Sequence, residues 1–248
     1  MSVPVFFVAD LALDATSLHI DGDEGRHAAT VKRLRIGEEI DVSDGVGVRA
    51  RAIVSAVGKD FVTVDVLAIS QEDSPQVSFS CAQALAKGDR ADLAIEILTE
   101  VGISEIIPWA AAHSIAKWDE KKSRAKWQRT AKEASKQSRR SYIPRIHDVH
   151  STQDICNLSD SFDVTIVLHE DGTVDLSTIE LPKVGSVMIV VGPEGGISST
   201  EIHSFEQSGA VIARIGPTVL RTSTAGGIAL GILASTTSQW RSATDSTS

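Results

Sequence analysis

The chain has 248 residues and a formal net charge of -9, so one large domain or two ordinary domains are expected. Hydrophobic residues make up 42% and aromatic residues only 4%, which predicts a folded protein with a core of Val, Ile, Leu and Ala. The two cysteines, Cys81 and Cys156, exclude a disulfide framework and favour a reducing compartment. Neither a signal peptide nor an apolar run of roughly 18 residues is present, so we expect a cytoplasmic protein without a membrane partner.

The first 73 residues carry short segments of alternating polarity that predict a small β-barrel. Residues 39–43 and 48–54 flank a turn at Asp44-Gly45, and residues 61–69 alternate in the same way. Between these strands, residues 25–35 predict a short basic helix with Val31 and Leu34 facing inward. Its charge fits either a solvated face or an RNA contact, and both readings stay open.

Residues 71–75 are polar and end in proline, which predicts a boundary between a domain of residues 1–73 and one of residues 74–248. After this point strands and helices alternate, as in an α/β domain with a parallel sheet. Strands are expected at residues 77–85, 106–109, 164–168, 187–191 and 210–215, and helices at 91–101, 121–141, 199–209 and 225–240. The tail from Ser242 is expected to fray.

The basic residues gather in the segment that holds the second of these helices. Eleven Lys or Arg lie between Lys117 and Arg145, against three acidic residues. A polyanion responds to this local field rather than to the negative net charge, so this segment is a candidate RNA contact.

Residues 187–196 (VMIVVGPEGG) combine a continuous apolar run with a glycine-rich turn. The run predicts a strand buried on both faces of a parallel sheet, and the turn allows a ligand to approach the backbone. Ligands of open α/β sheets bind beyond the carboxyl ends of the strands, where this turn is expected. A second turn, residues 215–225, is expected to complete one small-molecule pocket.

The second turn places one cation and three hydroxyl groups at a predicted helix start. Arg221 is expected to form either a salt bridge with Glu194 or a hydrogen bond with the substrate or its phosphate. Ser223 is interpreted as a plain N-cap, and His169 as a hydrogen-bonded residue at a strand end. The glycines of the helix, residues 226, 227 and 231, indicate that another backbone or a ligand approaches closely.

Several common chemistries have no motif in the sequence. The G-x-G-x-x-G and G-x-x-x-x-G-K-[ST] loops of nucleotide sites are absent, as are G-x-S-x-G and H-E-x-x-H. The seven histidines show no metal-ligand spacing, so no metal is expected.

Residues 191–196 (VGPEGG) and 220–225 (LRTSTA) together resemble the RsmE family of SPOUT methyltransferases, which act on the uracil N3 of a uridine in 16S ribosomal RNA of the small subunit. The similarity covers nearly the whole chain, and these two motifs are its most specific part. The weaker matches are residues 87–90 (KGDR) with 100–102 (EVG), 133–134 (EA) with 137–140 (QSRR) and Pro144, and 31–35 (VKRLR). Ser223 and Lys136 depart from the family, which usually or often has a carboxylate at these positions.

The resemblance implies an N-terminal PUA-like β-barrel, a C-terminal SPOUT α/β domain with a trefoil knot, and a homodimer. It implies a bent S-adenosyl-L-methionine as cofactor. The expected cofactor contacts are Leu168, His169, Gly192, Glu194, Gly196, Ile215, Pro217, Leu220 and Ala225.

For catalysis we expect Arg221 to stabilise the uracil anion, with Glu194 as a candidate general base. RNA phosphates are expected to contact Arg129, Lys132, Arg139 and Arg140, together with Arg33 and Arg35. The RNA partner is either free 16S ribosomal RNA or the assembled small subunit. Two alternatives remain, namely an RNA-binding assembly factor without catalysis and a methyltransferase for another site such as a tRNA ribose.

Overall fold

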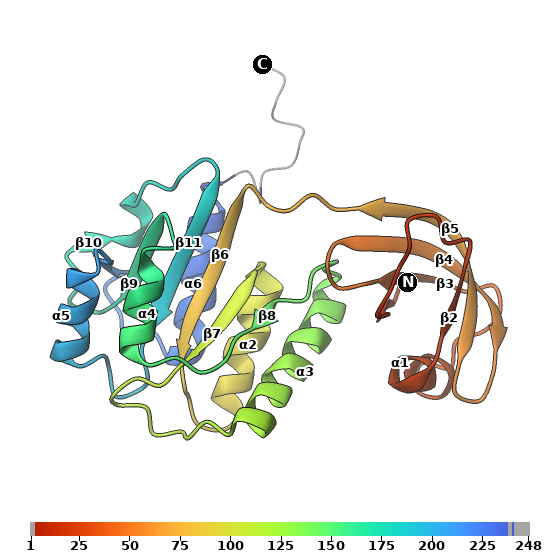
Figure 1. Cartoon of the computed structure of the whole chain (residues 1–248), viewed down its shortest axis with the longest axis horizontal. Coiled ribbons are helices and arrows are strands. Elements are labelled where there is room, and N and C mark those ends of the chain that lie inside the picture. Colours follow the sequence, from red (N-terminus) through yellow and green to blue (C-terminus); the bar gives the residue numbers. More distant parts are fainter. Residues whose placement is uncertain (1–2, 238–239, 241–248) are drawn as a thin grey trace, which may run out of the picture. The chain divides into compact units, whose positions relative to one another are not determined.

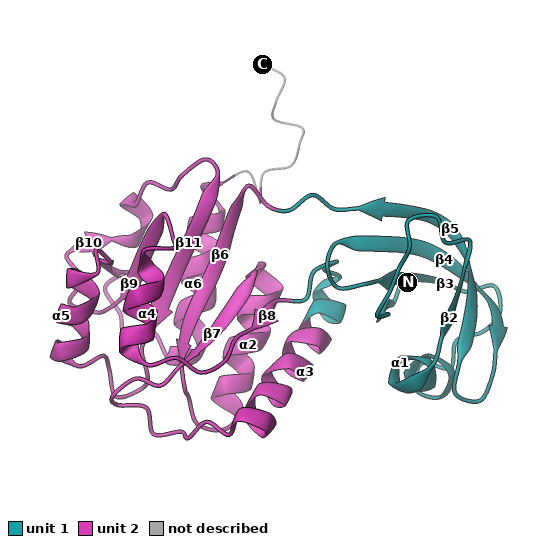
Figure 2. Cartoon of the chain, in the orientation of Figure 1, with its two compact units in different colours: residues 1–74, 135–143 teal, residues 75–134, 144–248 magenta. Residues whose placement is uncertain are grey.

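A computed structural model describes residues 3–237 and residue 240 (Figure 1). Residues 241–248, with the tail from Ser242 that was expected to fray, lie outside the described part. The chain forms two compact units (Figure 2). Unit 1 comprises Met1–Ser74 and Ser135–Ile143, and unit 2 comprises Pro75–Ala134 and Pro144–Ser248. The expected boundary after residue 73 placed residues 135–143 in the second domain, whereas the structure groups them with the first.

The described part of unit 1 is built around a curled five-stranded sheet. Its order is β1 (Val5–Phe7), β3 (Glu39–Ser43), β4 (Val48–Val57), β5 (Val62–Gln71) and β2 (Ser17–Ile20). β1 runs parallel to β3 and the other pairs are antiparallel. Alternate residues such as Ile40, Val54 and Val64 are buried inside the curl, as the alternating sequence predicts.

The basic segment after β2 departs from the expected helix. A short helix, α1 (Gly22–Arg26), continues into a π-helical turn, η1 (His27–Val31). Leu34 is buried as expected, but the prediction for Val31 was wrong, because its side chain is 65% exposed. A π-turn holds more residues than an α-turn, so a face assigned with the α-helical period drifts out of register. Arg33 then takes a left-handed φ of 54° and ends the segment.

Residues 135–143 complete unit 1 through hydrogen bonds to backbone carbonyls just beyond the strands of its sheet. The Ile143 N–H donates to the Gly45 carbonyl at 2.9 Å, and the Tyr142 hydroxyl donates to the Glu72 carbonyl at 2.8 Å. A Cβ on Gly47 would lie 2.4 Å from the Tyr142 hydroxyl oxygen, so only glycine leaves room for this ring.

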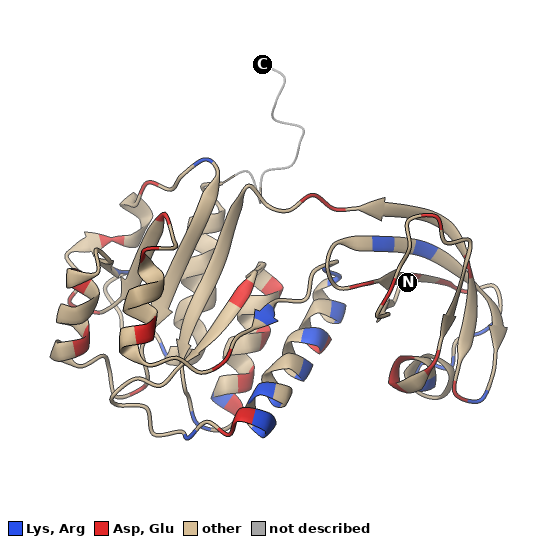
Figure 3. Cartoon of the chain, in the orientation of Figure 1, with Lys and Arg blue, Asp and Glu red and all other residues tan. Residues whose placement is uncertain are grey.

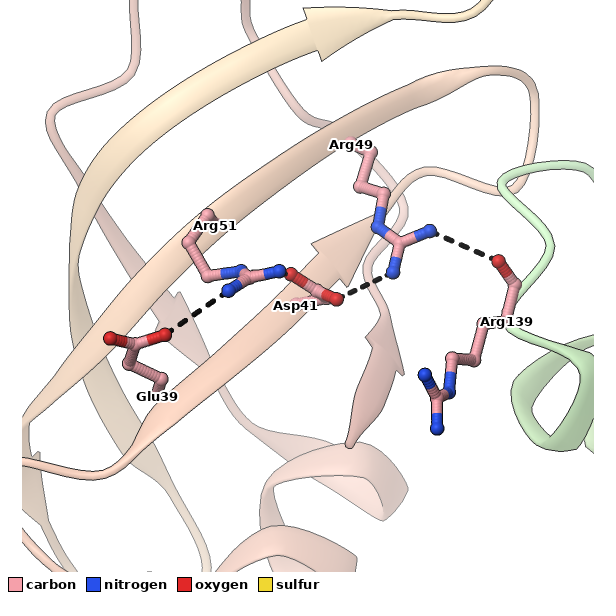
Figure 4. A network of polar contacts seen from close by, with 5 residues as sticks. All are labelled: Glu39, Asp41, Arg49, Arg51 and Arg139. Carbon is pink, nitrogen blue, oxygen red and sulfur yellow. Dashed lines mark hydrogen bonds and ion pairs between the residues drawn. The ribbon is translucent and has the colours of Figure 1, made fainter. Parts of the chain in front are cut away.

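One ion pair and one hydrogen bond fix the same segment in unit 1. Lys136 and Glu24 form a largely buried pair at 2.8 Å, so the lysine that departs from the family pattern has a partner on α1. Arg49 bonds the buried Asp41 carboxylate and also donates to the Arg139 carbonyl at 3.0 Å (Figure 4). Both contacts stabilise the turn at which Arg139 has a left-handed φ of 57°.

Unit 2 contains a seven-stranded sheet in its described residues, and every pair of neighbouring strands is parallel. The order is β10 (Val174–Asp175), β12 (Val211–Arg214), β9 (Val164–Leu168), β11 (Gly185–Val191), β6 (Val77–Ala84), β7 (Glu105–Trp109) and β8 (Arg145–Ile146). The apolar run at residues 187–191 therefore forms a central strand, as predicted, and Val187, Ile189 and Val190 are fully buried.

Helices cover both faces of this sheet (Figure 1). Their bounds are α2 (Asp89–Val101), α3 (Glu120–Ser138), α4 (Thr152–Ser159), α5 (Ser199–Gln207) and α6 (Thr222–Ala234), with a 3-10 turn, η2, at Leu176–Thr178. α2 and α6 pack together and α6 lies on β6 and β11, whereas Ile155 of α4 and Phe205 of α5 join the core on the opposite face. α2 ends at Gly102 in a left-handed conformation, as expected for a glycine stop.

The start of α6 differs from the prediction. The N-cap is Arg221 and the helix begins at Thr222, so the N-cap role expected of Ser223 was wrong. Ser223 lies inside the first turn and is 4% exposed. The glycines further along have the expected close neighbour, because a Cβ on Gly227 would lie 2.2 Å from Ile97 Cγ2 of α2. Helix α2 is therefore the partner that requires small residues here.

Candidate functional site

A cavity of about 310 Å³ lies where β9 and β11 end and α6 begins. A smaller cavity of about 70 Å³ shares Leu168, His169, Leu220 and Ala225 with it and extends to the end of β12. The strands β12, β9 and β11 are neighbours, so the turns that follow them meet at one edge of the sheet. Ligands of open parallel sheets bind at this edge.

The two glycine-bearing turns predicted from the sequence meet at this cavity. Its lining includes Leu168, His169, Gly192, Glu194, Gly196, Leu220, Arg221 and Ala225. Ile215 lines the smaller cavity, whereas Pro217 is exposed and lines neither of the two. His169 also behaves as a strand-end residue, since its Nδ1 accepts the Asp171 N–H at 3.2 Å.

Several lining residues were not predicted from the sequence. Arg90, on the first turn of α2, closes one side, although only the motif at residues 87–90 as a whole was expected to matter. Glu170, Val219 and Thr222 also line the cavity. Each is adjacent in sequence to a residue that was predicted, so the signal was the motif and not the individual side chain.

The glycines of the first turn leave the backbone accessible. Gly196 has a φ of 76°, and no atom lies within 4 Å of the place where its Cβ would be. Gly216, which lines the smaller cavity, also has open space at that position. A bulky ligand that binds mainly through backbone groups fits such a cradle, because side chains would fill the same space.

His113 braces the glycine-rich turn from outside. Its Nδ1 lies 3.0 Å from the Gly195 carbonyl oxygen and 3.1 Å from that of Gly196. Both partners are acceptors, so Nδ1 carries the hydrogen and donates. A Cβ on Gly195 would lie 3.0 Å from the His113 Cβ, so a glycine at this position lets the turn pass close to His113.

Glu201 connects the start of α5 to the loop at Ala112 and to the start of α4. The capping box with Ser198 is present as predicted, and the Glu201 carboxylate also accepts the Ala112 N–H and the Thr152 hydroxyl, each at 2.8 Å. Burial raises the pKa of Glu201, but these hydrogen bonds outweigh it, so the pKa lies below its ordinary value. An ionised carboxylate therefore holds the residue before His113 in place.

Arg221 and Glu194 are both exposed at the cavity. No ion pair joins them in the described structure, so the salt bridge considered for Arg221 is not formed. The guanidinium at the N-cap of α6 is thus available to a ligand in the cavity.

The cations predicted to bind RNA divide between the units. Arg33, Arg35, Arg139 and Arg140 belong to unit 1, and Arg129 and Lys132 to α3 in unit 2, where Lys and Arg occur along the helix (Figure 3). Arg33, Arg35, Arg129 and Arg139 are exposed. Arg140 is half-buried, and burial lowers its pKa to about 10 despite the nearby Glu72 carboxylate.

Within residues 3–237 and residue 240, no group of three or more His, Cys, Asp or Glu residues is arranged to hold a metal ion. None of the helices in this part of the chain combines the length and apolar character needed to cross a membrane.

Comparison with known proteins defines the class. An RNA methyltransferase domain model matches residues 72–234, and an RNA methyltransferase PUA domain model matches residues 20–67. The ribosomal RNA small subunit methyltransferase E of Mycobacterium bovis is 40% identical over 97% of this chain and 94% of that protein. Its Bacillus subtilis counterpart is 34% identical over 86% of this chain and 87% of that protein. The chain therefore belongs to the RsmE family of ribosomal RNA small subunit methyltransferases.

The fold agrees with this family. A crystal structure of the Neisseria gonorrhoeae ribosomal RNA small subunit methyltransferase E, bound to S-adenosyl methionine, has a TM-score of 0.87. It is 22% identical and the match covers 95% of this chain and 98% of that chain. The predicted fold class, a PUA-like N-terminal unit and a C-terminal α/β unit with a parallel sheet, is confirmed. The trefoil knot stays a prediction.

Proposed function

We propose that this protein transfers a methyl group from S-adenosyl-L-methionine to the N3 of a uridine in 16S ribosomal RNA. The observation that carries the proposal is the meeting of the two family turns, residues 191–196 and 220–225, around one cavity with accessible glycine backbone. Bound S-adenosylmethionine supplies a reactive sulfonium methyl, so the protein needs no metal for the transfer.

The predicted cofactor contacts are expected to act largely through backbone groups. Gly192 and Gly196 in the first turn, with Leu220 and Ala225 in the second, surround the cavity. Leu168 and His169 close it from the end of β9. Ile215 and the smaller cavity extend the space, so an elongated ligand can bend between the two.

Arg221 is proposed to act on the substrate. The N3 of uracil is a poor nucleophile until its proton leaves, and the resulting anion needs a nearby cation. The Arg221 guanidinium is exposed at the cavity and unpaired with Glu194, which suits this role. Glu194 remains a candidate for the base because it is exposed on the opposite turn.

Arg221→Ala tests this role. Removing one donor that stabilises a developing anion costs about 10²–10³ in rate, so methyl transfer should fall by that factor. Arg221→Lys keeps the charge but loses the planar fork, so it should retain part of the activity. Transfer should be followed with labelled S-adenosylmethionine on 16S ribosomal RNA and on the small subunit in parallel. Wild-type turnover in the alanine variant would remove Arg221 from the mechanism.

A non-catalytic RNA-binding assembly factor is the second candidate. Ser223 and Lys136 favour it, because the family usually has a carboxylate at the first position and often has one at the second, and Lys136 is paired with Glu24 in unit 1. Isothermal titration with S-adenosylmethionine separates the two, since a factor without catalysis need not bind it. A methyltransferase acting elsewhere, such as on a tRNA ribose, would be identified by mass spectrometry of nucleosides from a deletion strain.

RNA binding is proposed to use cations of both units, namely Arg33, Arg35, Arg139 and Arg140 of unit 1 and Arg129 and Lys132 of α3. Arg33→Glu with Arg35→Glu is the sharper test, because both side chains are exposed whereas Arg140 is half-buried. The slope of log affinity against log salt should fall by about one for each phosphate that the variant no longer binds. An unchanged slope would show that the segment carrying Arg33 and Arg35 is only a solvated face. The homodimer implied by the resemblance and the cytoplasmic location expected from the sequence stay predictions.

A further inference from the structure

Another cavity of unit 2 has no role in the proposed transfer. It measures about 190 Å³ and lies beyond the end of β6, at the same carboxyl edge of the sheet as the larger cavity. Its lining includes Leu85, Gly88, Lys117, Trp118, Lys126 and Trp127, and we call it the tryptophan pocket. Its volume suits one ring system rather than a whole cofactor.

Two tryptophans give this pocket an aromatic wall. Trp118 and Trp127 pack edge to face, with ring centroids 5.1 Å apart and planes at 83°. Trp127 is only 4% exposed, whereas Trp118 is half-buried, so part of the Trp118 ring remains open. The Trp118 indole N–H donates to the Glu120 carboxylate at 2.8 Å, which fixes the orientation of the ring.

Cations accompany the aromatic wall. Lys117 is exposed at the pocket, while Lys126 pairs with Asp92 at 2.7 Å. An aromatic face for stacking beside a cation for a phosphate is the combination by which proteins bind single-stranded nucleotides. An apolar peptide side chain would use the rings but not Lys117.

The start of α2 connects the two cavities. Arg90 lines the larger cavity, whereas Gly88 and Asp92 line the tryptophan pocket. The pockets therefore lie on either side of a single turn of chain. An RNA strand whose target base meets the donor at the larger cavity would bring a neighbouring nucleotide to the tryptophan pocket across this turn.

We propose that the tryptophan pocket binds the base of a nucleotide that flanks the target uridine, with its phosphate near Lys117. This inference rests on the proposed RNA substrate. It assigns Trp118 to substrate recognition and leaves donor binding to the larger cavity.

The test places 2-aminopurine, one position at a time, beside the target uridine of a 16S ribosomal RNA fragment. Stacking on Trp118 should quench the fluorescence at one flanking position when the wild-type protein binds. Trp118→Ala should abolish this quenching and raise the KM for RNA by about tenfold, as expected for loss of one stacked base. The Kd for S-adenosylmethionine should stay unchanged.

Two variants serve as controls. Trp118→Phe keeps an aromatic face and should restore quenching and KM. Ile115→Ala removes a side chain that is 78% exposed in the same loop and does not line the pocket, so it should behave as wild type.

The outcomes separate this inference from the proposed function. Methyl transfer without quenching at any flanking position in the wild-type protein would overturn the pocket assignment alone. Quenching without transfer would keep the pocket and reject the enzyme. Unchanged quenching and KM in Trp118→Ala would also overturn the assignment, and the wild-type measurement decides it if that variant does not fold.

Discussion

The packing of α6 against α2 predicts opposite effects for one substitution at two glycines. Replacing an interior helix glycine by alanine stabilises a helix by about 1 kcal/mol. At Gly231 the new Cβ would meet its nearest neighbour at 3.5 Å, an ordinary contact, so Gly231→Ala should gain this amount. At Gly227 the new Cβ would lie 2.2 Å from Ile97 Cγ2, which no real contact allows.

The magnitude follows from the overlap at Gly227. Ile97 Cγ2 branches directly from Cβ and cannot swing away without a change of rotamer. Overpacking of this kind costs about 1–3 kcal/mol. Because both variants gain the same helix propensity, the difference between Gly227→Ala and Gly231→Ala equals the packing cost. A difference of about 2 kcal/mol corresponds to roughly 4–8 °C in Tm for a chain of this size.

Thermal and urea unfolding of both variants measure this difference, and titration with S-adenosylmethionine adds a functional readout. Gly227 follows Thr222 by about one and a half turns of α6, and Thr222 lines the larger cavity, so a shifted α6 should also weaken donor binding. Equal stabilities for the two variants would refute the close approach of α2 and α6. A matching gain at both positions would show that helix propensity alone governs this helix.

Two further predictions concern the braces of the glycine-rich turn. Burial raises the pKa of Glu201, but its hydrogen bonds lower the pKa by more, so the net pKa is depressed. The ionised carboxylate therefore stabilises the fold above the unfolded pKa of about 4.3, and this stability is lost as the pH falls through the folded pKa. Between about pH 6 and pH 3, the free energy of unfolding from urea titrations should therefore fall less for Glu201→Gln than for wild type. Glu206 is exposed, so Glu206→Gln should follow wild type. Identical pH profiles for all three proteins would contradict this prediction. His113→Ala removes the donor to two carbonyls of the turn, so the Kd for S-adenosylmethionine measured by calorimetry should rise about fivefold. His203 is exposed, so His203→Ala should leave this Kd unchanged. An unchanged Kd in His113→Ala would show that the turn keeps its conformation without His113.

The sequence predicted the elements whose pattern is long or strongly apolar. The strand at residues 187–191 and the helix ending at Gly102 were both correct, because burial on two faces and a glycine stop leave clear local signals. The two-residue strands β8 and β10 were not predicted, since two residues are too few to show the alternating polarity of a strand. α4 was also missed, although its capping box from Ser151 to Asp154 was readable.

The errors arose where distant contacts decide the local structure. The basic helix was expected to reach residue 141 but ends at Ser138, and the residues that follow it bond Gly45 and Glu72 of unit 1. The π-turn reversed the expectation for Val31, whose exposure follows from backbone geometry that composition does not encode. In the candidate site the two turns were predicted as a pair, whereas His113 was not, because its contact with Gly195 depends only on the folded arrangement.

The order of strands also constrains how the chain acquires its structure during synthesis. β6 pairs with β11, and the Ser78 hydroxyl bonds the Gly185 carbonyl across 107 positions. The middle of the parallel sheet therefore stays open until the chain has grown well past its midpoint. Such late, non-local pairing is slow and leaves apolar strand edges exposed in the meantime. A nascent chain arrested before β11 would be a client for chaperones, even though the residues of β1 to β10 have all been synthesised.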